Sequence, residues 1–141
     1  MGNLSYHFNH KDFACRCDEC KGKGEFKIHL GLVGALEMIW EHFAKPVRII
    51  TGYRCEESTE KLAGGKSLHN KGKAANISVD GVALSDLFKF AEGLDELGGI
   101  GFYPDEKFIH IDTREGPREE WIKEGGKYIP LTGEKRRQWN L

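Results

Sequence analysis

The 141-residue sequence predicts one α+β domain, spanning residues 1–141, with a mainly antiparallel β-sheet and flanking helices. Helix-like and strand-like patterns follow one another in mixed order, and a turn signature joins two strand-like runs at residues 104–107. Strands joined by a short turn pair antiparallel, whereas parallel strands need a long crossover. A chain of this length forms one domain and buries roughly two thirds of its unfolded surface.

The N-terminal part of the chain predicts an irregular segment followed by a helix. Residues 3–27 are polar and lack a sustained period, so we expect Phe8 and Phe13 to anchor them to the core. Residues 28–43 carry apolar side chains at spacings of three and four, with glutamates on the opposite face. This pattern predicts an amphipathic helix that Pro46 stops, because proline lacks the amide proton and clashes with the preceding turn.

Two strands are predicted in the middle of the chain. Residues 47–51 are short and rich in β-branched side chains, which favours a strand. Residues 56–63 have a helical composition, and a glycine-rich loop follows them. Residues 73–79 then alternate, with apolar side chains on one face and Asn76 on the other. That alternation predicts a half-buried strand.

A helix and a hairpin are predicted next. Residues 84–97 have an apolar helical face, with Ser85 as the expected N-cap and a glycine pair just past the end. Residues 100–103 and 108–113 are strand-like, and the turn at residues 104–107 between them is typical of a β-hairpin. The hairpin supports the antiparallel sheet.

The C-terminal part is less regular. Residues 119–122 form a third amphipathic stretch, residues 128–131 a short apolar run, and the mildly basic residues 133–138 a solvated tail. The whole chain has 21 basic and 22 acidic residues and no block of like charge, which argues against nucleic acid or anionic lipid as a partner. We expect a monomer.

No targeting segment is visible at the start of the sequence. The first residues lack a basic region followed by an apolar stretch, and no apolar run approaches the roughly eighteen residues that span a bilayer. We therefore expect cytoplasmic synthesis and no membrane attachment. Action at a cell wall would then require release by lysis or a separate export route.

Three polar residues indicate a split metal site. His69 lies on the glycine-rich loop, Asn76 on the strand that follows, and His110 on the second strand of the hairpin. Asn76 and His110 each project away from apolar neighbours, so both side chains can point into one cleft. A catalytic zinc keeps three protein ligands and an open position for water. By spacing alone, surface or structural histidines remain the alternative.

Four segments match a known family in order and spacing. They are TGYR at 51–54, GGKSLHNKGKAANI at 64–77, GGIGFYP at 98–104 and FIHIDTR at 108–114. Over about residues 8–121 the chain resembles the zinc D-alanyl-D-alanine carboxypeptidases and murein endopeptidases, including small phage-encoded relatives, which are grouped with lysostaphin and the Hedgehog signalling domain. The resemblance implies a Hedgehog/DD-peptidase-like fold, a Zn²⁺ cofactor, and peptidoglycan stem or cross-link peptides as partners.

The resemblance also implies roles for individual residues. His69, Asn76 and His110 match the zinc ligands, and Asn76 stands where the family has aspartate. Arg54 matches an arginine that faces the substrate or the developing oxyanion, where a fixed cation stabilises charge. Asp112 matches an acidic residue that orients a ligand histidine or transfers a proton.

The implied reaction is hydrolysis of a peptidoglycan peptide bond by metal-activated water. The general base that many relatives carry just before the last ligand has no match, since Lys107 and Phe108 occupy those positions and Asp105 or Glu106 would have to reach in from the turn. The neutral amide of Asn76 weakens a zinc site. Two hypotheses stay open: a peptidase that is weakened or inactive, and a non-catalytic binding module on the same fold.

Four cysteines form a second candidate site. Cys15, Cys17 and Cys20 lie in an N-terminal segment of about residues 8–25, and Cys55 follows the arginine motif. Four thiolates can close a structural zinc site, and the spacing from Cys17 to Cys20 is common in such sites. Free thiols in a reducing cytoplasm, or disulfides in an exported protein, are the alternatives.

The remaining aromatic and histidine candidates have simpler interpretations. Trp121 matches an aromatic residue near the end of the family pattern and can line a substrate cleft, but core packing is favoured. His7, His10, His29 and His42 have no partner motif, so we expect surface or capping positions for them.

Overall fold

The computed structural model describes residues 4–14, 28–53 and 72–141. Its elements are α1 (His10–Phe13), α2 (Leu30–Phe43), β1 (Val47–Thr51), β2 (Ala74–Val79), α4 (Leu84–Glu92), β3 (Gly99–Tyr103), β4 (Phe108–Asp112), β5 (Glu119–Glu124), β6 (Lys127–Pro130) and α5 (Gly133–Trp139). The predicted helix at residues 56–63 lies outside the described residues, as do Arg54, His69 and the four cysteines.

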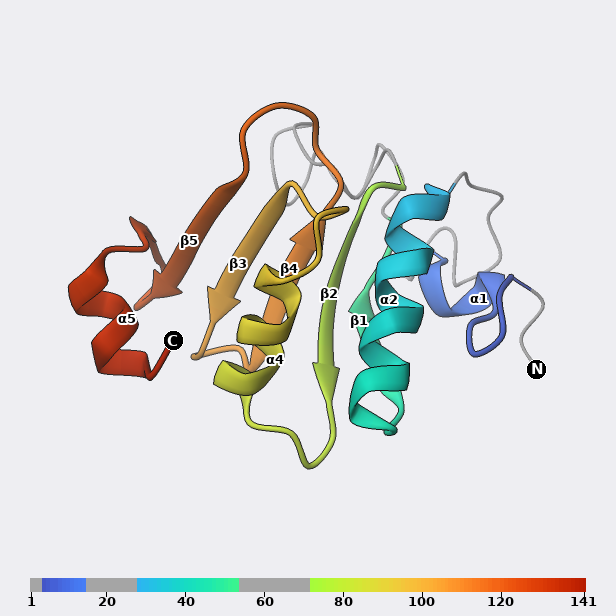
Figure 1. Ribbon diagram of the computed structural model, residues 1–141, viewed down its shortest axis with the longest axis horizontal. Helices are drawn as coiled ribbons and strands as arrows, with labels where there is room; N and C mark the ends of the chain where they lie inside the picture. The colour runs from blue at the N-terminus through green and yellow to red at the C-terminus, as the bar shows by residue number, and fades with distance from the viewer. Residues whose placement is uncertain (1–3, 15–27, 54–71) are drawn as a thin grey trace.

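One sheet organises the described part of the chain (Figure 1). Its strands follow the order β1-β2-β4-β3-β5-β6. Every neighbouring pair is antiparallel except β3 and β5, which run parallel. The predicted α+β class, the mainly antiparallel sheet and the hairpin between β3 and β4 are therefore confirmed.

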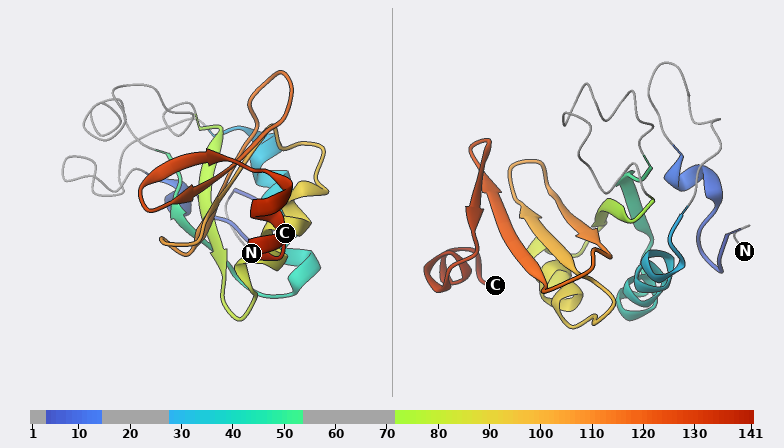
Figure 2. Two further views of the ribbon diagram at one scale, coloured as in Figure 1. Left: turned by 90° about the vertical axis from the view of Figure 1, so that its left-hand side faces the viewer. Right: turned by 90° about the horizontal axis from the view of Figure 1, so that it is seen from above.

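Helices α2 and α4 cover one face of this sheet, as the view from above shows (Figure 2). The core lies between them and the sheet. From the strands it takes Ile49, Ile77, Ile100, Phe102, Ile109, Ile111 and Ile122, and from the helices Leu32, Leu36, Ile39, Leu87 and Phe88. None of the helices in residues 4–14, 28–53 and 72–141 has the length and apolar character that a membrane span requires.

The N-terminal anchors and helix α2 match their predictions, whereas the segment predicted to be irregular contains the short helix α1. Phe8 and Phe13 are 1% and 0% exposed, which confirms that they anchor the segment before α2. His29 occupies the N-cap position of α2, and Ala44 leaves the helix in the left-handed conformation with a φ of 53°. The helix therefore ends before Pro46, where a further helical turn is blocked.

The second helix is shorter than its pattern predicts. Helix α4 ends at Glu92, and its N-cap is Ala83 rather than the predicted Ser85. Arg118 explains the early end, because its guanidinium donates hydrogen bonds to the backbone carbonyls of Glu92, Leu94 and Leu97 at 2.5–3.0 Å. These bonds replace the ones that further helical turns would make.

Residues 133–138, predicted as a solvated tail, are part of helix α5, in which no residue is buried but which contacts the rest of the domain. Thr132 caps this helix with a hydrogen bond from the amide of Lys135 to its hydroxyl oxygen. Trp139 lies 5.7 Å from the ring of Phe102, and its indole N–H donates to Glu124 at 3.0 Å. The charged tail is therefore held by long-range partners that its own sequence does not reveal.

A pair of carboxyl groups also holds α5 in place. Arg136 of α5 donates to Glu92 of α4 at 2.5 Å and to Glu120 of β5 at 3.2 Å. Although burial opposes its ionisation, Arg136 lowers the pKa of Glu92. Burial and the neighbouring Glu92 carboxylate raise the pKa of Glu120 to about 7. Glu120 Oε2 is buried and has no hydrogen-bond partner among the described residues.

Glu120→Gln is expected to stabilise the protein at pH 8, by about 1 kcal/mol, and to have little effect at pH 5. In the folded protein Glu120 keeps its proton up to about pH 7, whereas the ordinary pKa of a glutamate is 4.5. The stability that this proton provides is therefore lost as the pH rises through that range. Urea unfolding at both pH values measures the difference. The exposed Glu96→Gln is the control, and an equal gain for both variants would contradict the raised pKa of Glu120.

Candidate active site

The sheet register places five residues in one row across neighbouring strands. Asn76 of β2 lies opposite His110 of β4, and His110 lies opposite Gly101 of β3. Gly101 is in turn opposite Trp121 of β5, and Trp121 is opposite Pro130 of β6. Because side chains alternate along a strand, this row faces away from the core isoleucines. We call this side of the sheet the site face.

His110 makes a polar contact through each of its ring nitrogens. Its Nδ1 lies 3.0 Å from Asn76 Oδ1, and its Nε2 lies 2.7 Å from Asp112 Oδ2. All three side chains are buried, with Asp112 0% exposed. The prediction that Asn76 and His110 point to the same side of the sheet is therefore confirmed, and Asp112 joins them.

Asp112 is held as a carboxylate by its neighbours. Arg114 donates to its two oxygens through Nε at 3.0 Å and through Nη2 at 2.7 Å, and the backbone amide of Arg114 adds a third bond at 3.1 Å. Burial opposes the charge, but the hydrogen bonds from His110 and Arg114 outweigh it, so the pKa of Asp112 lies well below its usual range. An ionised Asp112 can only accept hydrogen bonds, so the proton on His110 Nε2 points toward it.

With this assignment, two hydrogen-bond acceptors face each other on the other side of the ring. In neutral His110, Nδ1 is a lone pair, and it faces the carbonyl oxygen of the Asn76 amide. Two acceptors at 3.0 Å are compatible when the imidazole carries a second proton, when the amide presents its nitrogen, or when both atoms bind one cation. A metal site is therefore one of three arrangements that are compatible with this pair.

Zinc fits these two donor atoms. Zinc bonds to nitrogen and oxygen are about 2.0–2.2 Å long, so two ligands of a tetrahedral ion lie roughly 3.3 Å apart. The separation of His110 Nδ1 from Asn76 Oδ1 is 3.0 Å. A carboxylate that accepts the other ring N–H is the usual support of a histidine ligand, and Asp112 holds that position.

The remaining predicted ligand falls outside the described residues. Within residues 4–14, 28–53 and 72–141, no three histidine, cysteine, aspartate or glutamate side chains are placed to hold a metal ion. Asn76 and His110 would thus need His69 to complete a three-residue ligand set. The oxyanion role of Arg54 and the structural zinc site of the four cysteines likewise stay predictions.

Trp121 lies on the site face rather than in the core, where packing was favoured. Its ring centroid is 5.3 Å from that of His110, and the guanidinium carbon of Arg114 is 5.1 Å from the indole ring. The close approach depends on Gly101, because a Cβ there would lie 2.6 Å from Trp121 Nε1. The indole N–H donates to the hydroxyl of Tyr103 at 3.2 Å. Trp121 thus forms a wall beside the histidine.

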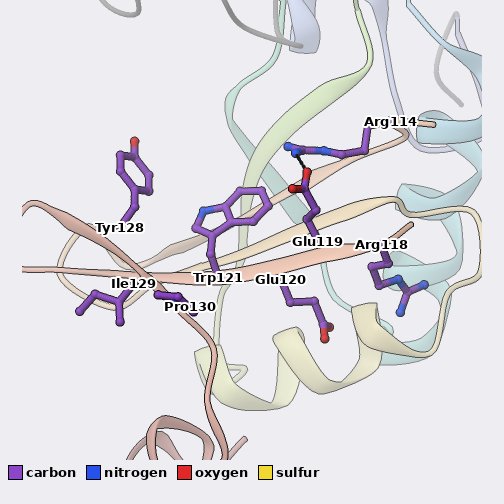
Figure 3. A pocket seen from close by; sticks show the side chains of 8 residues that line it. All are labelled: Arg114, Arg118, Glu119, Glu120, Trp121, Tyr128, Ile129 and Pro130. Carbon is purple, nitrogen blue, oxygen red and sulfur yellow. Dashed lines mark hydrogen bonds and ion pairs between the residues drawn. The ribbon is translucent and has the colours of Figure 1, made fainter. Parts of the chain in front are cut away.

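A surface groove of about 630 Å³ continues from Trp121 to the edge of the sheet (Figure 3). We call it the β5–β6 groove. It is lined by Arg114, Arg118, Glu119, Glu120, Trp121, Tyr128, Ile129 and Pro130. Sequence reasoning did not identify this groove. The sequence feature that points to the groove is the pair Trp121 and Tyr128, which are seven residues apart and become neighbours only when β5 and β6 pair.

The two turn carboxylates that would have to reach in to act as general base are engaged elsewhere. Asp105 accepts a hydrogen bond from the amide of Gly125 at 2.7 Å. Glu106 forms an ion pair with Lys123 at 3.2 Å. Both contacts draw the turn between β3 and β4 toward β5, so neither carboxylate is held against His110.

Comparison with known proteins connects this geometry to a family. The sequence model of Peptidase M15 matches residues 6–112. Over 83 residues the chain is 40% identical to the peptidoglycan L,D-endopeptidase MepK of Escherichia coli K12, and over 81 residues it is 36% identical to the probable peptidoglycan L,D-endopeptidase MepK of Haemophilus influenzae. These alignments cover 55% and 53% of this chain but only 44% and 42% of the relatives. No solved structure matches the chain significantly.

Proposed function

Because the chain belongs to the Peptidase M15 family and has its Hedgehog/DD-peptidase-like fold, we propose that it is a zinc-dependent peptidase that hydrolyses a peptide bond of peptidoglycan. The observation that carries the proposal is the cluster of Asn76, His110 and Asp112 on the site face. Peptidases of this family are generally zinc-dependent. The relatives are described as L,D-endopeptidases, which supports a bond between an L- and a D-residue as the target.

In this proposal His69, Asn76 and His110 hold the zinc ion. When bound, zinc supplies a water of lowered pKa and polarises the scissile carbonyl. Asp112 accepts a hydrogen bond from the Nε2–H of His110 and thereby keeps the Nδ1 lone pair directed at the metal position. Arg54 stabilises the developing oxyanion.

The same contacts support one of the two roles considered for Asp112. Both of its oxygens already accept hydrogen bonds from His110 or Arg114, and its pKa is lowered. A carboxylate with so low a pKa is a weak base near neutral pH. We therefore assign Asp112 to the orientation of His110 rather than to proton transfer.

A non-catalytic binding module remains the second candidate, and Asn76 is the observation that favours it. A neutral amide is a weaker zinc ligand than the aspartate that the family resemblance places there. The Asn76 oxygen is also satisfied without metal whenever His110 is doubly protonated, because Nδ1 then donates to it. Such a chain of hydrogen bonds would keep the site face folded and leave it free to bind.

Purified protein supplied with zinc is expected to release muropeptide fragments from peptidoglycan, and His110→Ala to reduce the rate at least 100-fold. Chromatography with mass spectrometry identifies the fragments and the bond that is cut. His42→Ala is the control, since that ring stacks on Phe90 at 3.9 Å on the core side of the sheet. Equal rates for wild type and His110→Ala would contradict the peptidase, and binding to peptidoglycan without cleavage would support the binding module.

A further inference from the structure

The β5–β6 groove extends the site face with exposed aromatic rings. Trp121 lies opposite Pro130, and Lys123 lies opposite Tyr128, so these side chains share one side of the sheet. Figure 3 shows the rings of Trp121 and Tyr128 projecting to the same side of the β5–β6 pair. Tyr128 is 67% exposed, so its side chain is largely open to solvent. Aromatic surface therefore runs from His110 to the edge strand.

The cations beside these rings are already neutralised. Arg114 pairs with Asp112 and Glu119, and Lys123 pairs with Glu106. The ammonium of Lys123 also lies 5.4 Å from the centroid of the Tyr128 ring. An anionic ligand would have to break one of these pairs before it gained a partner. The groove therefore suits an uncharged ligand that has apolar faces and polar edges.

Arg118 is likewise already engaged and does not offer its charge to an anionic ligand. Its guanidinium donates to three backbone carbonyls at the end of α4 and projects away from the Trp121 side of the strand (Figure 3). Glu120 lies beside it and contacts Arg136. Arg118 and Glu120 thus line the side of the groove that faces α4, away from the Trp121 and Tyr128 rings, and their charges hold the helices.

We propose that the β5–β6 groove binds an uncharged amino-sugar ring of the glycan strand that carries the substrate peptide. The C–H faces of a pyranose ring pack on aromatic rings such as Trp121 and Tyr128, while its hydroxyl and acetamido groups hydrogen-bond to the Arg114–Glu119 pair at the rim. The β5–β6 groove has a volume of about 630 Å³, which lies within the range of small-molecule sites. Because Trp121 contacts both the groove and His110, a sugar held here places its attached peptide beside the metal position.

This inference rests on the proposed function but adds to it. The groove is built by residues 114–130, whereas the family match ends at residue 112. It is therefore a feature of this chain beyond the matched segment.

The test uses a β-1,4-linked N-acetylglucosamine tetramer and the zinc-loaded full chain. We expect the tetramer to shift the indole N–H resonance of Trp121, which is identified by its loss in Trp121→Phe. Tyr128→Ala is expected to weaken binding at least fivefold, as measured by titration calorimetry. Tyr6→Ala is the matched control and should bind normally, because Tyr6 is also 67% exposed but precedes α1 in the chain, and α1 lies at the opposite end of the sheet from β5. Equal affinities for both variants, or no binding by wild type, overturn the proposal.

Cleavage assays separate this inference from the proposed function. With substrates that carry the same stem peptide with or without glycan, Tyr128→Ala is expected to raise KM more for the glycan-linked one. Cleavage by wild type without tetramer binding overturns the sugar site and leaves the peptidase standing. Tetramer binding without cleavage supports the groove and contradicts the peptidase. If Tyr128→Ala weakens binding of the glycan-free anionic peptide equally, the groove holds peptide, and the sugar proposal fails.

Discussion

Asn76→Asp is expected to raise zinc affinity and the rate of peptidoglycan cleavage by at least 10-fold. The substitution keeps the shape of the side chain and places a carboxylate oxygen where Asn76 Oδ1 lies, 3.0 Å from His110 Nδ1. An anionic ligand attracts the dication more strongly than an amide, and the buried surroundings screen the attraction weakly. Removing a group that hydrogen-bonds to a metal ligand typically lowers metal affinity or activity 10- to 100-fold, even when the ligands themselves are intact. Competition with a chromophoric chelator measures the affinity, and muropeptide release measures the rate.

Ser78→Asp is the matched control for this substitution. Ser78 lies on the same strand and, by alternation, on the same face as Asn76, but it pairs with Arg48 rather than with a site residue. Ser78→Asp adds the same charge two residues further along β2, so zinc affinity should change little. If Asn76→Asp neither binds zinc more tightly nor cleaves peptidoglycan, and wild type is also inactive, the peptidase is contradicted and the binding module is favoured.

Asp112→Asn is expected to lower both stability and zinc affinity. Removing one partner of a buried ion pair usually costs 3–5 kcal/mol, and we expect about 2–3 kcal/mol here because Arg114 keeps Glu119 and is partly exposed. The neutral side chain also no longer fixes the Nε2 proton of His110, so zinc affinity and activity should fall 10- to 100-fold. Urea unfolding gives the free energy, and zinc titration below the unfolding transition gives the affinity.

The control is Asp80→Asn, whose carboxylate forms an exposed ion pair with Arg48 at 3.3 Å. Exposed pairs contribute about 0–1 kcal/mol, so this variant should unfold almost as wild type does. The zinc affinity separates the two roles of Asp112. If Asp112→Asn is destabilised but binds zinc as tightly as wild type, the carboxylate stabilises the sheet without orienting His110.

Local patterns predicted the elements of the fold because they depend on short-range geometry. The three- and four-residue spacing of apolar side chains predicted α2, and the two-residue alternation of residues 73–79 predicted β2. Alternation also predicted that Asn76 and His110 face away from the core, since neighbouring side chains in a strand point to opposite faces. What failed was the extent of α4, where Arg118, more than twenty residues later in the chain, takes the terminal carbonyls.

The C-terminal region shows where local patterns stop being informative. Residues 133–139 are charged and short, so their composition favours a solvated tail. They form α5 because Arg136 reaches the Glu92–Glu120 pair and Trp139 reaches Phe102. Helices of this length are marginal alone and depend on packing. Such packing comes from partners distant in sequence.

The sequence by itself determined that this protein has an α+β domain with segments of the Peptidase M15 family, and that an amide stands where the family resemblance places a carboxylate. Those properties reside in residue types and short spacings. Only the tertiary structure decided that Asn76 and His110 share one register position, that Asp112 and Arg114 support the histidine, and that Trp121 opens a groove beside it. Strand order and register come from pairing between distant segments, and above all from the parallel pairing of β3 with β5, which no local pattern specifies.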